Sequence, residues 1–264
     1  MIRIDFLGTG NAFTPLGRLH ALALIDNKIL IDTPPTLITQ LRRKGINTSA
    51  IEHLLFTHWH ADHTFGFPFF LLERKYISDP KQKKKLNIYL RPGGKKILSD
   101  LCNMGFPGSL EDMEKTSNWF EEEKISLPKT NWEFERFAVL HTPETDPHGY
   151  ELTHNSGLVI LHCGDSGPCE EIEKRAEKSD IVILEMGMPD IGDFPYHYTP
   201  SDVRRFSKKF PNTLILVTHN FSNSSESNEG FSIPDLPERV HQLEDGDVLE
   251  ISPQKNFKIT SHNK

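Results

Sequence analysis

The stretch LLFTHWHADHTFGF, residues Leu54 to Phe67, decides the fold. A short apolar run leads directly into four strong metal-ligand types: His58, His60, Asp62 and His63. In an extended segment, residues i and i+2 share a face, so His58 and His60 can hold one ion together. Asp62 and His63 are adjacent, so they cannot share a face in an extended strand and instead fit a turn into a helix. There their side chains would point beyond the first ion. Two metal ions roughly 3.5–4 Å apart therefore accommodate the four side chains better than one.

The composition narrows the class of protein. The 264 residues are enough for one large α/β domain or two small ones, and 36% hydrophobic with 25% charged residues is ordinary for a soluble globular chain. Three cysteines are too few for a disulfide framework, and we see neither a leader pattern nor a membrane-length apolar run. We therefore expect a cytoplasmic protein without a membrane partner. The net charge of −7 argues against a protein whose main role is to bind long nucleic acid.

Short apolar runs alternate with helical patterns along the chain, which predicts an α/β layered domain. The segment ALALIDNKILID, residues 21–32, predicts a hairpin that turns at Asp26 and Asn27. Several of the predicted strands end in a ligand-type residue: His58, His141, Asp165, Glu185 and His219. Sites of α/β sheets form outside the carboxyl ends of strands, so these five residues predict one shared site.

Five motifs, in this order, resemble the metallo-β-lactamase-fold superfamily: FLGTG, ILIDTPP, THWHADH, LHCGDSG and LVTHN. The resemblance runs from Ile2 to about Ser222, and the H-x-H-x-D-H pattern is its most specific part. It implies a four-layer αββα sandwich, formed as a single metallo-hydrolase domain over residues 1–264. It also implies a metal site at one edge of the two sheets.

The same resemblance implies roles for individual residues. One metal ion would be bound by His58, His60 and His141, and a second by Asp62, His63 and His219. Asp165 would bridge the two ions, and Asp32 would orient a ligand histidine. Histidine-rich ligand sets suit zinc, while manganese and iron stay open.

The third histidine ligand has two candidates in HTPETDPHGYEL, residues 141–152. His141 directly follows the predicted strand FAVL, where a ligand should lie, and we favour it. His148 is then expected in a loop near the mouth of the site.

The segments PHGYEL, SDIVILEM and YHYTPSDV resemble the RNase Z and phosphodiesterase branch of the superfamily. That likeness implies that Glu185 pairs with His197, and the alternative for His197 is an exposed loop residue. His197, oriented and kept protonated by Glu185, would donate a proton to the leaving group, and Asp62 would orient the attacking hydroxide and accept its proton. Only 23 residues separate His141 from Asp165, which leaves room for a hairpin but not for the long arm of tRNA-processing enzymes.

We therefore expect a dinuclear hydrolase of a small phosphodiester, such as a cyclic or dinucleotide-like substrate. Hydrolysis of a lactone, thioester or other ester on the same metal cage is the first alternative. A non-haem iron dioxygenase is less favoured because His60 and the complete second ligand set are present. A homodimer stays open.

The segment from Cys102 to Thr130 is hard to interpret: CNMGFPGSL looks irregular, and Phe106 packs either over the site or into the core. The polar segment from Asn220 to Gly230 is expected to be a loop.

Overall fold

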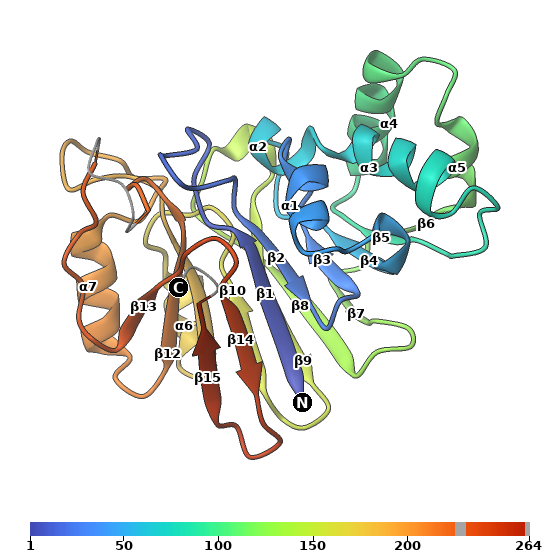
Figure 1. Cartoon of the computed structure of the whole chain (residues 1–264). Coiled ribbons are helices and arrows are strands. Elements are labelled where there is room, and N and C mark those ends of the chain that lie inside the picture. The colour runs from blue at the N-terminus through green and yellow to red at the C-terminus, as the bar shows by residue number, and fades with distance from the viewer. Residues whose placement is uncertain (225–230, 262–264) are drawn as a thin grey trace. The chain divides into compact units, whose positions relative to one another are not determined.

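The computed structural model describes residues 1–224 and 231–261 and groups the chain into two compact units. Unit 1 comprises residues 1–7, 22–122 and 248–264, and unit 2 comprises residues 8–21 and 123–247. Each unit is built on one mixed β-sheet with helices, which confirms the predicted α/β class (Figure 1). Of the polar segment from Asn220 to Gly230, residues 225–230 lie outside the described part of the chain.

Unit 1 contains an eight-stranded sheet whose strands β3 to β6 run parallel, as expected for strands linked by helical crossovers. In spatial order its strands are β15 (Phe257–Thr260), β14 (Val248–Ile251), β1 (Ile2–Gly8), β2 (Leu22–Ile25), β3 (Ile29–Ile31), β4 (His53–Leu55), β5 (Asn87–Tyr89) and β6 (Asn118–Phe120). The predicted hairpin joins β2 and β3, and Asp26 and Asn27 both adopt positive φ in the three-residue turn between Ile25 and Ile29.

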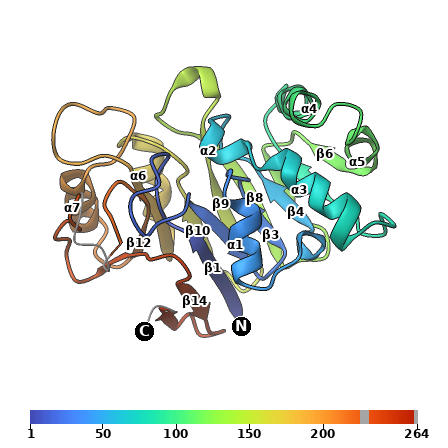
Figure 2. The same cartoon turned by 45° about the horizontal axis from the view of Figure 1, so that its top comes forward.

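The helices of unit 1 cover one face of this sheet. Helices α1 and α3 lie side by side (Figure 2). Apolar residues such as Leu41 of α1, Phe70 of α3 and Leu98 of α4 pack with Leu30 and Leu54 of the sheet in one core. The helical segments are α1 (Leu37–Arg43), a 3-10 turn (Thr48–Ala50), α2 (Ala61–Thr64), α3 (Phe67–Glu73), a π-helical turn (Arg74–Ser78), α4 (Gly94–Gly105) and α5 (Glu111–Thr116).

Unit 2 contains a seven-stranded sheet in which β10 to β13 run parallel and β7 to β10 run antiparallel. In spatial order its strands are β13 (Val240–Gln242), β12 (Leu214–Asn220), β11 (Ile181–Met186), β10 (Val159–His162), β9 (His148–His154), β8 (Trp132–Ala138) and β7 (Lys124–Ser126). The antiparallel pair β9–β10 occupies the interval between His141 and Asp165, as the 23-residue spacing predicts.

Two helices, α6 (Glu170–Ala176) and α7 (Pro200–Lys209), cover one face of the unit 2 sheet, and a 3-10 turn spans Pro143–Thr145. Ile172 of α6 and Phe206 of α7 share a core with Val182 and Ile215 of the sheet. A capping box fixes the start of α7: Asp202 N donates to Thr199 Oγ1, and Thr199 N donates to Asp202 Oδ2. Thr199 is two residues from His197, so this cap also limits where the chain carries that histidine.

The structure corrects two interpretations of the sequence. Cys102 to Gly105 is not irregular, because these residues form the last turn of α4, and Cys102 lies in the unit 1 core. Phe106, just beyond the helix, packs against the same core and forms an edge-to-face contact with Phe69. His148 is not a loop residue: it is the first residue of β9, is buried, and its Nε2 lies 3.2 Å from the Tyr150 hydroxyl.

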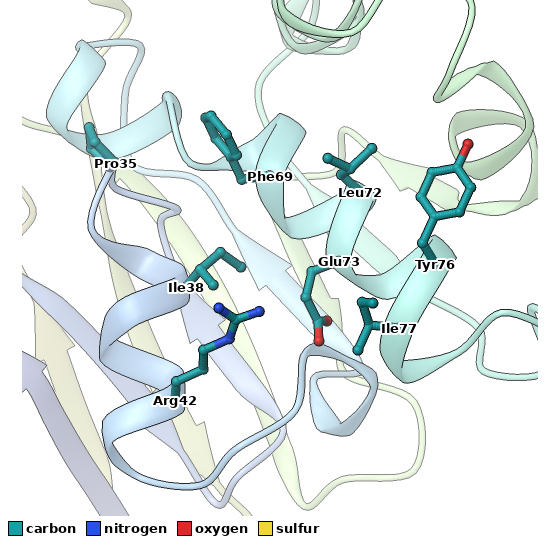
Figure 3. A pocket seen from close by; sticks show the side chains of 8 residues that line it. All are labelled: Pro35, Ile38, Arg42, Phe69, Leu72, Glu73, Tyr76 and Ile77. Carbon is teal, nitrogen blue, oxygen red and sulfur yellow. The ribbon is translucent and has the colours of Figure 1, made fainter.

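A pocket opens on unit 1 where α1 faces α3 and the π-helical turn that follows α3 (Figure 3). Phe69, Leu72 and Tyr76 contribute apolar surface, while Arg42 and Glu73 add one charge of each sign. The described residues contain no helix that is long and apolar enough to cross a membrane.

Candidate metal-binding and catalytic residues

Unit 1 brings together the four ligand-type residues that follow β4. The chain leaves β4 in extended conformation and enters α2 at Ala61, with His60 as the residue before the helix. His58 Nε2 and His60 Nδ1 lie 3.1 Å apart, a separation at which two ring nitrogens share either a proton or a metal ion. His63 Nε2 lies 3.3 Å from Asp62 Oδ2, within the helix. The expected turn from strand to helix is therefore present.

A second layer of polar groups orients these histidines. Asp32, directly after β3, accepts from His63 Nδ1 at 2.8 Å and from the Thr57 backbone N–H and hydroxyl at 2.8 and 2.7 Å. Thr57 Oγ1 lies 3.0 Å from His58 Nδ1. Nδ1 of both His58 and His63 meets an oxygen, so Nε2 of each ring faces the other candidate ligands: His60 Nδ1 for His58 and Asp62 Oδ2 for His63. The expected contact of Asp32 with a candidate ligand histidine is present.

In unit 2, the candidate residues gather at the carboxyl ends of the parallel strands β10, β11 and β12. Asp165 follows β10, while Glu185 and His219 are the next-to-last residues of β11 and β12. The β11–β12 pairing runs from Glu185–Thr218 to Met186–Asn220, so His219 is the extra residue of a bulge. Its φ of +49° is costly for a residue with a side chain. The bulge changes the direction of the His219 side chain. As a result, His219 Nε2 lies 3.2 Å from Asp165 Oδ2.

Glu185 holds His197 through a buried carboxylate. Glu185 Oε1 accepts from His197 Nδ1 at 2.8 Å and from Ser166 N at 3.2 Å, while Oε2 accepts from Gly187 N. Burial raises the pKa of Glu185 above its ordinary value, and the His197 imidazole opposes that rise. With Nδ1 engaged, His197 presents Nε2 for proton exchange, and the side chain is 24% exposed. The expected Glu185–His197 contact is thus present.

Two further histidines border this pair. The His197 ring stacks on His219 with centroids 6.0 Å apart and an interplanar angle of 6°. His141 meets His197 edge to face at 4.9 Å, and His141 Nδ1 donates to Tyr196 O at 3.0 Å. As in unit 1, this contact fixes the ring through Nδ1, so Nε2 is the nitrogen with which His141 would bind a metal ion. His148 does not belong to this group, because its ring contacts Tyr150 and Asp146 O.

The donor atoms of unit 2 fit a divalent metal ion. One ligand atom from each of His141, Asp165 and His197 lies within 4.8 Å of the other two, and the same holds for Glu185, His197 and His219. Imidazole nitrogens with carboxylate oxygens are the ligand types of zinc, and manganese and iron accept them as well. The geometry of unit 2 therefore admits His197 as a metal ligand as well as a proton donor.

Sequence reasoning missed the groups that hold the site residues in place. Thr57, Tyr196 and Gly187 each donate to or accept from a candidate residue, yet none is a ligand type. Thr57 beside His58 and Tyr196 beside His197 gave a positional signal, whereas Gly187 gave none. Gly187 is required for close packing, because a Cβ there would lie 2.7 Å from His197 Nδ1 and 2.8 Å from Glu185 Oε2.

Comparison with solved structures defines the class of protein. The metallo-β-lactamase-fold protein YhfI from Bacillus subtilis matches with a TM-score of 0.71 at 12% identity, covering 94% of this chain and 98% of that one. A diphosphatase from the PhnP family matches with a TM-score of 0.69 at 21% identity, covering 96% and 98%. These likenesses confirm the predicted metallo-β-lactamase fold, whose relatives include hydrolases.

Comparison with known sequences gives the family. The model of the family described as Anti-Pycsar protein Apyc1 matches residues 2–230, so the chain belongs to that family. Ribonuclease Z from Pyrococcus abyssi is 24% identical over 258 residues, which cover 79% of this chain and 83% of that protein. The cGMP-dependent 3′,5′-cGMP phosphodiesterase A of Dictyostelium discoideum is 25% identical over 234 residues, covering 81% of this chain but only 25% of that longer protein.

Proposed function

We propose that the protein is a metal-dependent phosphodiesterase that hydrolyses small phosphodiesters of the nucleotide type, cyclic nucleotides included. The observation that carries this proposal is the Glu185–His197 pair beside His141 and His219. It places a proton-donating nitrogen next to candidate metal ligands. An alkoxide leaving group needs such a donor, whereas the thiolate of a thioester leaves without one. A relative named as a 3′,5′-cGMP phosphodiesterase supports the same substrate class.

We propose that two divalent metal ions, zinc in the first instance, are bound by His58, His60, Asp62, His63, His141, Asp165 and His219. When bound, such a pair of ions supplies hydroxide at neutral pH and neutralises charge on a non-bridging phosphate oxygen. The orientation of His58 and His63 by Thr57 and Asp32 supports this assignment for unit 1. In unit 2, the backbone carbonyl of Tyr196 orients the His141 ring by accepting a hydrogen bond from its Nδ1.

The protein side chains then divide the proton transfers. Asp62 accepts the proton of the attacking water. Its carboxylate oxygen Oδ2 lies 3.3 Å from Nε2 of His63, a proposed metal ligand, which would place the proton acceptor beside a metal-bound water. His197 donates a proton from Nε2 to the departing alkoxide. Glu185 holds the His197 ring by Nδ1, and two backbone N–H groups fix the Glu185 carboxylate in turn.

Cleavage of precursor tRNA is the second candidate, because a Ribonuclease Z is among the relatives. The β9–β10 hairpin fills the segment between His141 and Asp165, which argues against a tRNA-clamping arm at that place. Lactone hydrolysis also expels an alkoxide, so the Glu185–His197 pair would serve it too, and the substrate panel separates it from phosphodiester hydrolysis. Thioester hydrolysis and iron-dependent dioxygenation are further candidates that no contact among the described residues favours.

A substrate panel tests the proposal. The zinc-loaded and manganese-loaded protein is incubated with bis(p-nitrophenyl) phosphate, the four 3′,5′-cyclic nucleotides, a β-lactam, a glutathione thioester, a lactone and precursor tRNA. We expect the phosphodiesters to be hydrolysed at least tenfold faster, by kcat/KM, than the lactam, thioester and lactone. A large margin in favour of any carboxylic or thiol ester would overturn the proposal. Efficient cleavage of precursor tRNA would overturn the argument from the missing arm.

A further inference from the structure

The strained backbone at His219 is held from two sides within unit 2. His219 has a φ of +49°, and Asn220, the next residue, lies between the end of β11 and the loop that follows β1. Asn220 N donates to Thr9 O at 2.7 Å, and Asn220 O accepts from Asn11 N at 3.0 Å. On the side of β11, the backbone N–H of the following residue donates to Met186 O at 3.1 Å. A strained conformation persists only where its surroundings determine it, so these bonds help to maintain the bulge.

Arg18, in the same loop after β1, is a buried cation. Its side chain is 0% exposed, and a guanidinium group has five N–H donors that all need acceptors. All five are used, at distances from 2.6 to 3.3 Å, by the backbone carbonyls of Ser222, Asn223 and Leu243, the Thr9 hydroxyl and the Glu244 carboxylate. Because each donor has its own acceptor, Arg18 fixes several separate chain segments relative to one another.

These acceptors belong to the segments that surround His219. Ser222, whose carbonyl accepts from Arg18 Nε at 2.9 Å, lies three residues after His219. Leu243 N donates to Val217 O at 2.9 Å, so Leu243 is attached to β12 two residues before His219. Thr9 supplies the carbonyl that binds the residue after His219. Arg18 therefore ties the backbone before and after His219 to the loop that holds the bulge.

The shape of the guanidinium group explains why an arginine is needed at this position. Thr9 Oγ1 accepts from Arg18 at 2.6 Å and donates to Asp245 Oδ1 at 2.8 Å, and Asp245 Oδ2 accepts from Leu19 N at 2.7 Å. The loop is thus fixed on both sides of Arg18. A lysine has a single ammonium group, so its donors start from one point and cannot reach carbonyls in separate segments with the same geometry.

We propose that Arg18 is a positioning residue for the metal site of unit 2: it keeps the backbone around His219 in the bulged conformation that brings His219 Nε2 to Asp165. None of the five acceptors of Arg18 is a candidate ligand, so Arg18 acts only through the backbone. The consequence for metal binding rests on the proposed function, whereas the effect on the backbone does not. Without Arg18, residues 219–223 can relax to an unstrained backbone, and His219 then loses its direction.

Hydrogen exchange of the metal-free full chain tests the positioning directly. Arg18→Met removes all five donors and keeps an apolar side chain of similar length. We expect the backbone N–H groups of Asn220 and Phe221 to exchange about tenfold faster or more in this variant, relative to those of residues 181–184 in β11, which report global stability.

Arg74→Met is the matched control for this experiment. Arg74 is also fully buried, and it donates to four backbone carbonyls of unit 1, those of Thr48, Ile51, Lys84 and Lys85. Its loss should therefore lower the free energy of unfolding as well. We expect Asn220 and Phe221 to keep their protection, relative to residues 181–184, in Arg74→Met.

Titration with Co²⁺, followed by visible absorption, tests the consequence for the metal site. We expect Arg18→Met to bind one of two ions about 10- to 100-fold more weakly and with a changed spectrum, and Arg74→Met to bind both as wild type does. Arg18→Lys keeps the positive charge beside Glu244 without the five donors. It should regain part of the lost stability but neither the protection nor the affinity, and it decides the question if Arg18→Met does not fold.

The exchange result decides the proposal. Unchanged relative protection of Asn220 and Phe221 in the Arg18 variants would overturn it, and so would equal effects of Arg18→Met and Arg74→Met on these two groups. Full recovery of protection and affinity in Arg18→Lys would show that the charge alone suffices, and would also overturn it. A wild-type protein that binds no Co²⁺ would overturn the proposed metal assignment, whereas exchange of the metal-free chain would still decide the role of Arg18.

Discussion

Replacing Gly187 with alanine should impair catalysis without unfolding the protein. The backbone of Gly187 is not in the left-handed region, so alanine is compatible with its conformation. The new methyl group, however, would lie 2.7 Å from His197 Nδ1 and 2.8 Å from Glu185 Oε2, where ordinary contact begins at 3.4 Å. Ring and methyl must therefore separate by about 0.7 Å, and the half-buried His197 ring is the part that can move.

The size of the effect follows from that displacement. A misplacement of about 1 Å in a catalytic group costs on the order of 10²-fold in rate. We therefore expect Gly187→Ala to lower kcat by about 10- to 100-fold for a diester with an alkoxide leaving group. The loss should be much smaller for methyl p-nitrophenyl phosphate, because nitrophenolate leaves without a proton donor. Folding stability should fall by about 1–3 kcal/mol, because the methyl group overpacks a site that includes the buried Glu185 carboxylate and the reduced entropy of the unfolded chain offsets only part of that cost.

The assay compares two alanine substitutions on two substrates, together with thermal unfolding. Gly105→Ala is the matched control: its new Cβ would lie 3.7 Å from its nearest neighbour, Pro68 Cβ, which is an ordinary contact. The substrates are the cyclic phosphate of propane-1,3-diol and methyl p-nitrophenyl phosphate. If Gly187→Ala stays within threefold of wild type on both substrates, the close packing around His197 has no catalytic role.

Two further predictions concern the metal ligands. The purified protein should bind close to two divalent ions per chain by elemental analysis, and His63→Ala should lose mainly one of them; a wild-type stoichiometry that stays at one after saturation would refute the dinuclear assignment. Asp62→Asn should keep the circular dichroism spectrum and lower kcat by about 10²–10⁴-fold, because it removes the proton acceptor. Activity of this variant within tenfold of wild type would contradict the role given to Asp62.

The sequence predicted those parts of the fold that depend on local patterns. Apolar runs that end in ligand types located β4, β10, β11 and β12, and Asp26 and Asn27 located the turn between β2 and β3. The pairing of Glu185 with His197 was accessible through the family resemblance, and the carboxylate and ring nitrogen do meet.

Other parts depend on tertiary contacts and could not be read from the sequence. Helix α4 was obscured because it begins at Gly94 and ends at Gly105, although its Leu98 and Cys102 face the core. His148 was assigned to a loop because His141, directly after the predicted strand FAVL, was preferred as the ligand, whereas β9 begins at His148. The bulge that changes the direction of the His219 side chain arises from the pairing of β12 with β11. No residue type in the sequence indicates that bulge.

The central claim is that His197, held by Glu185, supplies the proton to an alkoxide leaving group. The most direct measurement is kcat of His197→Ala on the cyclic phosphate of propane-1,3-diol and on methyl p-nitrophenyl phosphate, with metal content determined on the same samples. We predict a loss of about 10²–10⁴-fold on the alkoxide substrate, less than tenfold on the nitrophenyl substrate, and an unchanged metal content. Equal losses on the two substrates, or loss of a metal ion, would show that His197 is a ligand or a structural residue and contradict the claim.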